Sequence, residues 1–156
     1  MTPLSVGLGD LATTFVNGVS YGMILVLVAL GLSLVFGLMG VLNFAHGALF
    51  MLGGYIGLAV MELTGGGITG FVLALIIAPL VVAAIGAGLE RTVYKPLYDT
   101  EPIYQLLLTF GLAVVIEEAV KYIWGAAPPG VPPRPAVFDG AVVFMGISLP
   151  YYRVFT

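Results

Sequence analysis

The stretch LATTFVNGVSYGMILVLVALGLSLVFGLMGVLNFAHGALFMLGGYIGLAVM, residues 11–61, decides the fold, because it contains no Asp, Glu, Lys or Arg. His46 is the only side chain in it that can take a positive charge. A bilayer core about 30 Å thick needs ~20 apolar residues for each helical span. The stretch is therefore long enough for two membrane-spanning helices.

Composition extends this pattern to the whole chain. Charged residues make up 8% and hydrophobic residues 60% of the sequence, whereas an average soluble domain has roughly 25% and 45–50%. A second charge-free run lies between Glu62 and Glu90. A soluble protein of this size could not solvate so much apolar surface. The sequence therefore predicts an all-α integral membrane protein, a polytopic helical bundle.

Four membrane-spanning helices are expected, with boundaries set by glycine clusters and charged residues. Glu62 and the three-glycine turn at 65–67 separate the second span from the third, because glycine clusters interrupt helices. Pro79 lies within the third span and predicts a kink there, since neighbouring helices can satisfy the carbonyl group that it frees. The expected spans are residues 11–38, 44–61, 68–89 and 102–124.

Charged residues gather around the fourth span. The connection Glu90–Glu101 holds Arg91 and Lys95, and the positive-inside rule favours placing it in the cytoplasm. Near the other end of the span, Glu117 and Lys121 are four residues apart, so they share a helix face and can form an ion pair.

Residues 125–149 form an outer loop of different character, with five prolines that favour polyproline II geometry. Asp139-Gly140 precedes the strand-like residues 141–144, and such a dipeptide suits the positive φ angles of a type I′ turn. A small extracytoplasmic β-hairpin is therefore expected there. Ser148 can then cap a fifth helix that begins at about residue 150, with Pro150 in its first turn.

Small residues at four-residue spacing are expected to bring the helices together, because close packing drives helix association in a bilayer. The chain has 22 glycines among 156 residues, about twice the usual ~7%. Packing is the simpler interpretation, although glycines also permit the unwinding and sliding that transporters need. The expected packing pairs are Gly18 with Gly22, Gly53 with Gly57, and Ala84 with Gly88.

Asn43 and His46 stand out as strongly polar side chains inside the first charge-free run, three residues apart and so on one helix face. Asn43 also suits a helix N-cap. A helix that starts there points its free amides and positive dipole end at the space before it, an arrangement that binds carboxylates and recurs in the broken helices of transporters. The simpler alternative is a turn at the membrane surface, with His46 bonded to a neighbouring carbonyl.

Other function classes find no support in the sequence. One histidine and one amide are too few ligands for a metal site, and no catalytic partner accompanies His46, because Glu62 is about four turns away along the helix. The chain has no cysteine, which excludes disulfides and thiolate metal sites. A net charge of −3 without a basic stripe argues against a nucleic-acid partner.

Several motifs together give the chain a resemblance to a known family, over essentially its whole length. The most specific is Asn43-Phe44-Ala45-His46-Gly47. With the segments NGVSYG (17–22), ALG (29–31), VFG (35–37), ERTVYKPL (90–97) and LTFG (108–111), it resembles the LivH-type permease subunit of branched-chain amino acid ABC transporters. Ala48 departs from the pattern, because many relatives carry an acidic residue there. An acid that tuned the charge of the substrate would be missing here.

The resemblance implies that residues 1–156 are the N-terminal part of a single transmembrane permease domain in the bacterial cytoplasmic membrane. A second permease subunit, two cytoplasmic ATPase subunits and a periplasmic substrate-binding protein would complete the importer. ATP and Mg²⁺ would bind the ATPase subunits, so no cofactor is expected in this chain. Leucine, isoleucine or valine would be the substrate, with Asn43, His46 and Gly47 in its pathway.

Two alternatives stay open. Similar permeases carry urea or short amides, and nothing in the sequence excludes such a substrate. The family's permeases are also longer than this chain, so a truncated gene or a fragment is expected, and a truncated form could act as a non-transporting membrane scaffold.

Overall fold

The computed structural model describes residues 8–126, 140–144 and 147–150. Four helices in this part of the chain are long and apolar enough to cross a membrane. They lie close to the four segments expected from the sequence: α1 (Leu8–Met39), α2 (Ala45–Leu63), α3 (Gly67–Leu89) and α4 (Pro102–Trp124). The protein is therefore a multi-pass helical membrane protein, as the sequence predicted.

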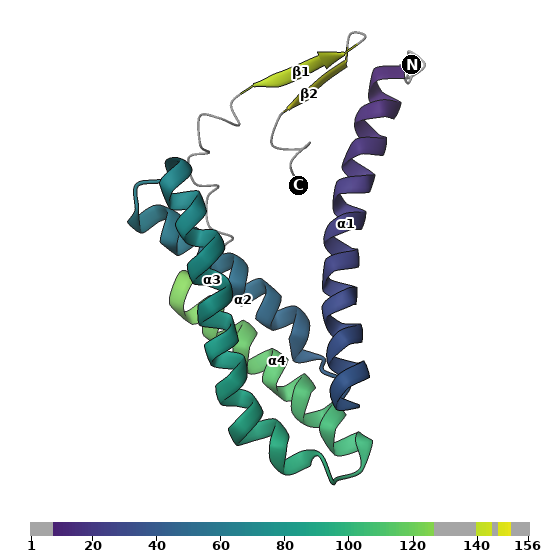
Figure 1. Ribbon diagram of the computed structural model, residues 1–156, viewed down its shortest axis with the longest axis vertical. Helices are drawn as coiled ribbons and strands as arrows, with labels where there is room; N and C mark the ends of the chain where they lie inside the picture. Colours follow the sequence, from purple (N-terminus) through teal and green to yellow (C-terminus); the bar gives the residue numbers. More distant parts are fainter. Residues whose placement is uncertain (1–7, 127–139, 145–146, 151–156) are drawn as a thin grey trace.

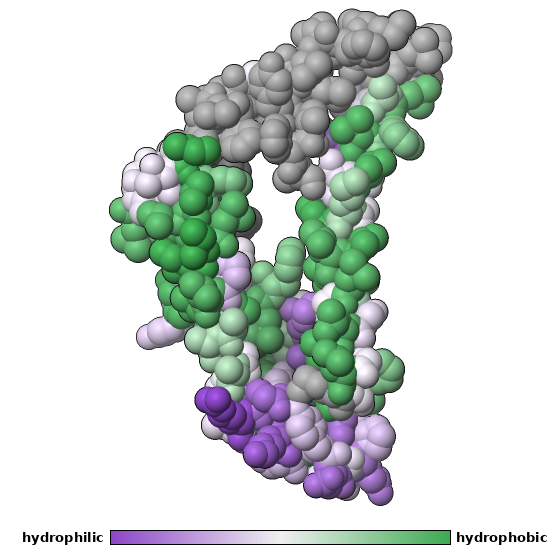
Figure 2. Space-filling model, viewed as in Figure 1, coloured by the Kyte–Doolittle hydropathy of each residue, from purple (hydrophilic) through white to green (hydrophobic). Residues whose placement is uncertain are grey.

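Three of the helices form a bundle and the first stands apart from it. α2 packs against both α3 and α4, whereas α1 meets α2 mainly at its C-terminal end (Figure 1). Figure 2 shows open space between α1 and the bundle, bordered by apolar side chains. Large apolar side chains such as Phe15 and Leu38 are 72% and 78% exposed. Such exposure suits a protein whose surroundings are lipid tails or other membrane helices.

The buried core of the bundle is made of small and medium side chains. α3 contributes Ala74 and Ala78, and α4 contributes Ile116 and Val120. Val41 in the break and Ala45 at the start of α2 are also buried, at 5% and 0% exposed, and Tyr94 beyond α3 is the large exception at 7%. The small Ala78 lets α2 and α3 approach closely at Gly57, where an added Cβ atom would lie 3.9 Å from it.

The connection between α3 and α4 is helical for most of its length. α3 continues into a π-helical turn, Glu90–Tyr94, and a 3₁₀ turn, Lys95–Leu97, before Pro102 opens α4. Gln105 of α4 donates a hydrogen bond to the Leu97 carbonyl at 3.0 Å, which holds the connection against the helix. Hydrophilic residues gather at this end of the molecule (Figure 2).

The β-hairpin differs from the one expected. β1 (Ala141–Phe144) pairs antiparallel with β2 (Ile147–Pro150), with Phe144 opposite Ile147, so the strands are separated by residues 145 and 146 and not by Asp139-Gly140. Both sites offer an X-Gly dipeptide. Pro135 lies among the residues that would have to pair upstream of Asp139, and proline cannot donate to a sheet ladder. The flanks of 145–146 therefore form the better strands.

The expected start of a fifth helix is also wrong for the residues that the structure describes. Ser148 and Pro150 lie in β2 and not at a helix cap and first turn. Ile147 and Leu149 are residues that fit strands, so pairing with β1 takes precedence over the local capping signal. The rest of that helix, like most of the proline-rich loop, falls outside the described residues.

Candidate functional site

The break between α1 and α2 is the centre of the candidate site. α1 ends at Met39, and Gly40 follows with a φ of 67°, a left-handed conformation that glycine adopts without steric cost. Its amide donates to the Phe36 carbonyl at 2.8 Å, which closes the last turn. α2 then begins at Ala45, after a short non-helical segment. The sequence predicted a break in this region, and the glycine that ends α1 explains it.

Asn43 is buried in the break but does not cap α2 with its side chain. The N-cap is Phe44, which has no side-chain capping bond, and the Asn43 carbonyl accepts from the His46 amide at 3.2 Å. The Asn43 side chain instead accepts a hydrogen bond from the hydroxyl of Tyr94, with Oδ1 and the phenol oxygen 3.0 Å apart. A buried amide oxygen needs a donor, and Tyr94 supplies one from the π-helical turn that follows α3.

Thr109 of α4 holds the same segment from another side. Its hydroxyl is fully buried and lies 3.2 Å from the Leu42 carbonyl and 3.1 Å from that of Leu106. The roles of Tyr94 and Thr109 could not be inferred from spacing, because the partner of each in the break lies more than fifty residues away along the chain. Tyr94 and Thr109 lie in two segments that carry the family resemblance, ERTVYKPL (90–97) and LTFG (108–111), but the resemblance does not assign either residue a role.

His46 lies between α2 and α1, against Gly31. A Cβ atom added at Gly31 would lie 2.7 Å from His46 Nε2 and 2.9 Å from Cε1, closer than real Cβ contacts come. The imidazole therefore occupies space that only a glycine leaves free. This contact joins α1 to α2 near the break, and it puts His46 where both helices border open space.

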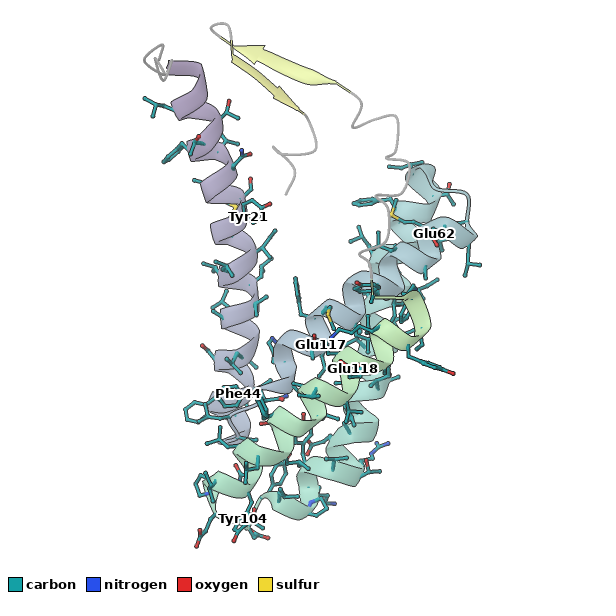
Figure 3. The ribbon with its side chains drawn as sticks, turned by 180° about the vertical axis from the view of Figure 1, so that it is seen from behind. Tyr21, Phe44, Glu62, Tyr104, Glu117 and Glu118 are labelled. Carbon is teal, nitrogen blue, oxygen red and sulfur yellow. The ribbon has the colours of Figure 1, made fainter. Side chains whose placement is uncertain are left out.

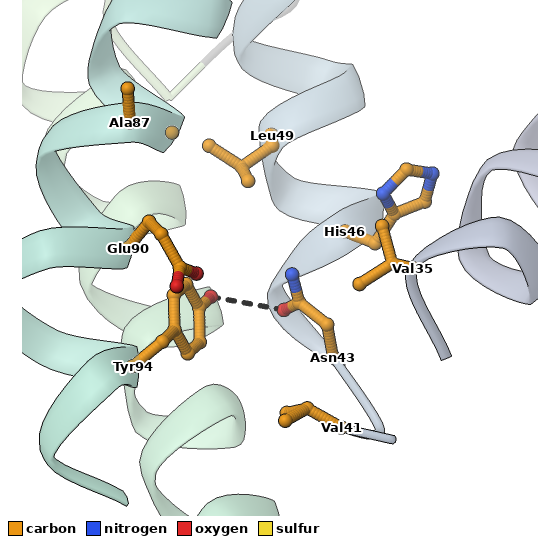
Figure 4. Close-up of a pocket in the computed structure, with 9 residues that line it drawn as sticks. Val35, Val41, Asn43, His46, Leu49, Ala87, Glu90 and Tyr94 are labelled. Atoms are coloured by element: carbon orange, nitrogen blue, oxygen red, sulfur yellow. Dashed lines mark hydrogen bonds between the residues drawn. The ribbon is translucent and has the colours of Figure 1, made fainter. Parts of the chain in front are cut away.

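A cavity of about 310 Å³ opens beside the break, and we call it the polar cavity (Figure 4). Side chains from α1, the break, α2, α3 and the π-helical turn surround it. Its lining residues are Val35, Val41, Asn43, His46, Leu49, Gly86, Ala87, Glu90 and Tyr94. It therefore combines four polar side chains with apolar walls.

A longer apolar groove of about 690 Å³ runs between α2 and α3 and also reaches His46. Gly53 and Gly57 line it, and a Cβ atom added at these glycines would lie 3.5 Å from Val82 and 3.9 Å from Ala78, respectively. A third hollow of about 130 Å³ is lined by Gly47 and again by His46. His46 is thus shared by all three spaces.

The expected packing glycines divide into two groups. Gly53 and Gly57 bring α2 close to α3, as described above. At Gly18, Gly22 and Gly88 a Cβ atom would meet nothing within 4 Å, and Ala84 is exposed on α3. Within the described residues, these positions make no close helix contact.

Among the described residues, Glu90 is the only Asp, Glu, Lys or Arg that lines the polar cavity. Lys121 pairs with Glu117 at 2.8 Å and Glu118 at 3.0 Å on α4, so the predicted pair is confirmed and has a second acid. Figure 3 shows Glu62 and Phe44 at opposite ends of α2, which leaves the Glu62 carboxylate far from the break. In the described part of the chain, no three His, Asp or Glu side chains gather as metal ligands.

Comparisons with known proteins agree on one family. Residues 14–154 match the model described as "Branched-chain amino acid transport system / permease component". The high-affinity branched-chain amino acid transport system permease protein LivH of Escherichia coli (strain K12) is 30% identical over 133 residues, which cover 80% of this chain and 41% of that protein. The corresponding protein BraD of Pseudomonas aeruginosa is 29% identical over 147 residues, 89% of this chain and 48% of the relative.

The chain therefore spans less than half the length of these curated relatives. No solved structure gives a significant match.

Proposed function

The chain belongs to the family of branched-chain amino acid transport permease components, and from this premise we propose that it forms part of the substrate pathway of an ABC importer for hydrophobic amino acids. Its 156 residues would be the N-terminal part of a single transmembrane permease domain. The observation that carries the proposal is the break between α1 and α2. There a histidine borders three spaces within otherwise apolar helices, and a buried asparagine borders two of them.

Transport needs a route for a polar solute across an apolar layer, and polar side chains within spans are costly unless they serve such a route or are paired. Asn43 has a structural partner in Tyr94. His46 lies against Gly31 and borders one space between α2 and α3 and another between α1 and the start of α2. We assign His46, with Asn43 and Gly47, to the substrate pathway.

The energy source and the partners follow from the same premise. A second permease subunit, two cytoplasmic ATPase subunits that bind ATP and Mg²⁺, and a periplasmic substrate-binding protein would complete the importer in the bacterial inner membrane. We place Glu90–Glu101 on the cytoplasmic side, because Arg91 and Lys95 lie in this short polar connection. The β-hairpin would then be extracytoplasmic.

The glycines that make no close contact among the described residues are also consistent with a permease domain. Gly18 and Gly22 lie four residues apart on α1 and have free space around them, and small residues at this spacing suit helix contacts in membranes. We propose that they, with Ala84 and Gly88 on α3, pack against helices outside the described residues.

Uptake by the assembled importer tests the proposal. We expect His46→Ala and Asn43→Ala to reduce uptake of radiolabelled L-leucine into proteoliposomes by at least about tenfold, because each removes a polar group from the pathway. Tyr122→Phe is the control, since that ring is 92% exposed near the end of α4. Unchanged uptake by both alanine variants at normal protein levels would contradict the assignment.

Urea or a short amide is the alternative substrate, and the same assay separates the two. Uptake of urea but not of leucine by the unmodified importer would favour the alternative.

A further inference from the structure

The polar cavity contains a hydrogen-bond donor whose direction is fixed by the structure. Asn43 Oδ1 accepts from the Tyr94 hydroxyl, so the amide nitrogen must face the other way. Figure 4 shows this nitrogen pointing into the cavity, away from Tyr94. An amide nitrogen carries two donors and no acceptor. It therefore suits an acceptor group on a bound molecule, such as a carboxylate.

Glu90 provides a negatively charged hydrogen-bond acceptor on the opposite wall of the cavity. Its side chain lines the cavity from the first residue of the π-helical turn. Among the described residues it takes part in no ion pair, because the two ion pairs there belong to Lys121. Among the described residues, its hydrogen-bond partner is Tyr98, whose hydroxyl donates to Oε1. A carboxylate has room for several donors, so Glu90 can also accept from a bound ammonium group.

Tyr98 stays neutral, so its hydrogen bond to Glu90 does not change the charge of the cavity. Burial, the hydrogen bond to Glu90 and the nearby negative charge raise the pKa of Tyr98 to about 12. The phenol is therefore protonated at physiological pH and donates to Glu90 without bringing a charge of its own. The negative charge of Glu90 stays available to a ligand.

Apart from His46 and Tyr94, the rest of the cavity lining is apolar. Figure 4 shows Leu49 above Asn43 and Glu90, Val35 beside His46, and Val41 below Asn43. A volume of about 310 Å³ is at the lower end of the range of ~300–1,000 Å³ found for small-molecule sites. Of the residues that the structure describes, no lysine or arginine lines the cavity. The donor, the carboxylate and the apolar wall match the three parts of a free amino acid with an aliphatic side chain.

We propose that the polar cavity is a binding site for a zwitterionic aliphatic α-amino acid, with Glu90 as the residue that holds its ammonium group. Asn43 Nδ2 donates to the substrate carboxylate, and Val35, Val41 and Leu49 receive the side chain. This inference rests on the proposed transport function and sharpens it. Urea or a short amide can donate a hydrogen bond to Glu90 but has no positive charge to pair with it, so Glu90 favours amino acids over amides.

Photo-crosslinking of the assembled transporter tests the site directly. The probe is L-photo-leucine, a diazirine analogue of leucine, with labelled positions located by mass spectrometry. We expect labelling within residues 35–49, displaced by L-leucine but not by 4-methylpentanoate, which has the same carbon skeleton without the ammonium group. Glu90→Gln keeps the shape and the acceptor for Tyr98 but removes the charge. It should weaken labelling by at least about tenfold, as expected for losing a hydrogen bond between charged groups.

Glu101→Gln is the matched control, because Glu101 is exposed at the start of α4, makes no side-chain capping bond and does not line the cavity. It should label like the unmodified protein. Equal labelling of the Glu90→Gln and Glu101→Gln variants, or displacement by 4-methylpentanoate as effective as by leucine, would overturn the assignment of Glu90.

Different results would contradict the proposed site and the proposed transport function. If the unmodified transporter takes up leucine and only the Glu90 result is negative, the site is wrong and the transport function stands. If the unmodified transporter takes up urea and not leucine, the proposed function and the site are both wrong.

Discussion

At the scale of single residues, the sequence singles out Asn43 and His46 but not what they touch. Both are visible as polar side chains in a charge-free run. Their partners, Tyr94 and Gly31, come from other helices, and a hydrogen bond across fifty-one residues leaves no local pattern. Asn43 looked like a helix cap because its residue type suits one. The nearby Tyr94 hydroxyl uses its side-chain oxygen instead.

The Gly31 contact gives a prediction with two glycine controls. Gly31→Ala should displace the His46 imidazole and lower the free energy of unfolding by about 1 kcal/mol, the lower end of the cost of overpacking, because the atoms it meets are the far end of a side chain that can move. Gly37→Ala on the same helix and Gly111→Ala on α4 should be neutral or stabilising, because a Cβ atom at either position meets nothing within 4 Å. Denaturation of the purified protein in detergent, followed through its single tryptophan, Trp124, measures all three.

Removing the imidazole by His46→Ala tests whether Gly31→Ala acts through its contact with His46. If Gly31→Ala acts by meeting His46, adding His46→Ala should make the glycine substitution nearly harmless. If Gly31→Ala lowers the free energy of unfolding equally with and without the His46 side chain, the alanine must clash with another residue.

The hydrogen bond from Tyr94 to Asn43 is tested by Tyr94→Phe. The substitution leaves a buried amide oxygen without its donor, which should cost about 1–3 kcal/mol. Tyr104→Phe is the control, since that ring is 57% exposed at the start of α4. The same denaturation experiment compares them, and a Tyr94→Phe variant as stable as the control would contradict the role given to this bond.

At the scale of elements, hydrophobic runs in the sequence predict the helices. The structure of the connections between helices is harder to predict from the sequence. The long apolar stretches and the 65–67 glycines are local signals, and the helices lie close to where these put them. The sequence places the hairpin turn wrongly because two X-Gly dipeptides suit a turn. Which of them forms it depends on whether the residues on both sides can pair as strands. The helical continuation of α3 through Glu90–Leu97 was also missed, since its charges suggested an ordinary loop.

The end of α1 is the element boundary with the sharpest physical cause. Gly40→Ala places a side chain at a φ of 67° and should cost about 1–2 kcal/mol, the penalty for a left-handed residue with a Cβ atom. Gly37→Ala, one turn earlier inside the helix, is the matched control and should not destabilise. Unfolding midpoints in detergent measure the difference. A Gly40→Ala variant no less stable than Gly37→Ala would mean that α1 does not end in this way.

At the scale of the whole molecule, membrane insertion follows from composition, whereas the site follows only from the fold. Insertion is readable from charge-free runs alone. The meeting of α1, the break and α2 with the end of α3 and its π-helical turn is not, because it depends on how the helices pack. That meeting point forms the polar cavity, and α1 is joined to the bundle mainly there (Figure 1).

The most direct test of the central claim, that the break lies on the substrate pathway, uses the absence of cysteine in the natural chain. A thiol introduced by His46→Cys in the assembled transporter is exposed to a charged, membrane-impermeant thiol reagent, with and without L-leucine. Phe110→Cys on α4 is the control, because Phe110 is 62% exposed and lines none of the three spaces. The account predicts that the thiol at position 46 reacts and that leucine protects it, while the thiol at position 110 stays unmodified. A thiol at position 46 that is as unreactive as the one at position 110, or that reacts equally with and without leucine, would contradict it.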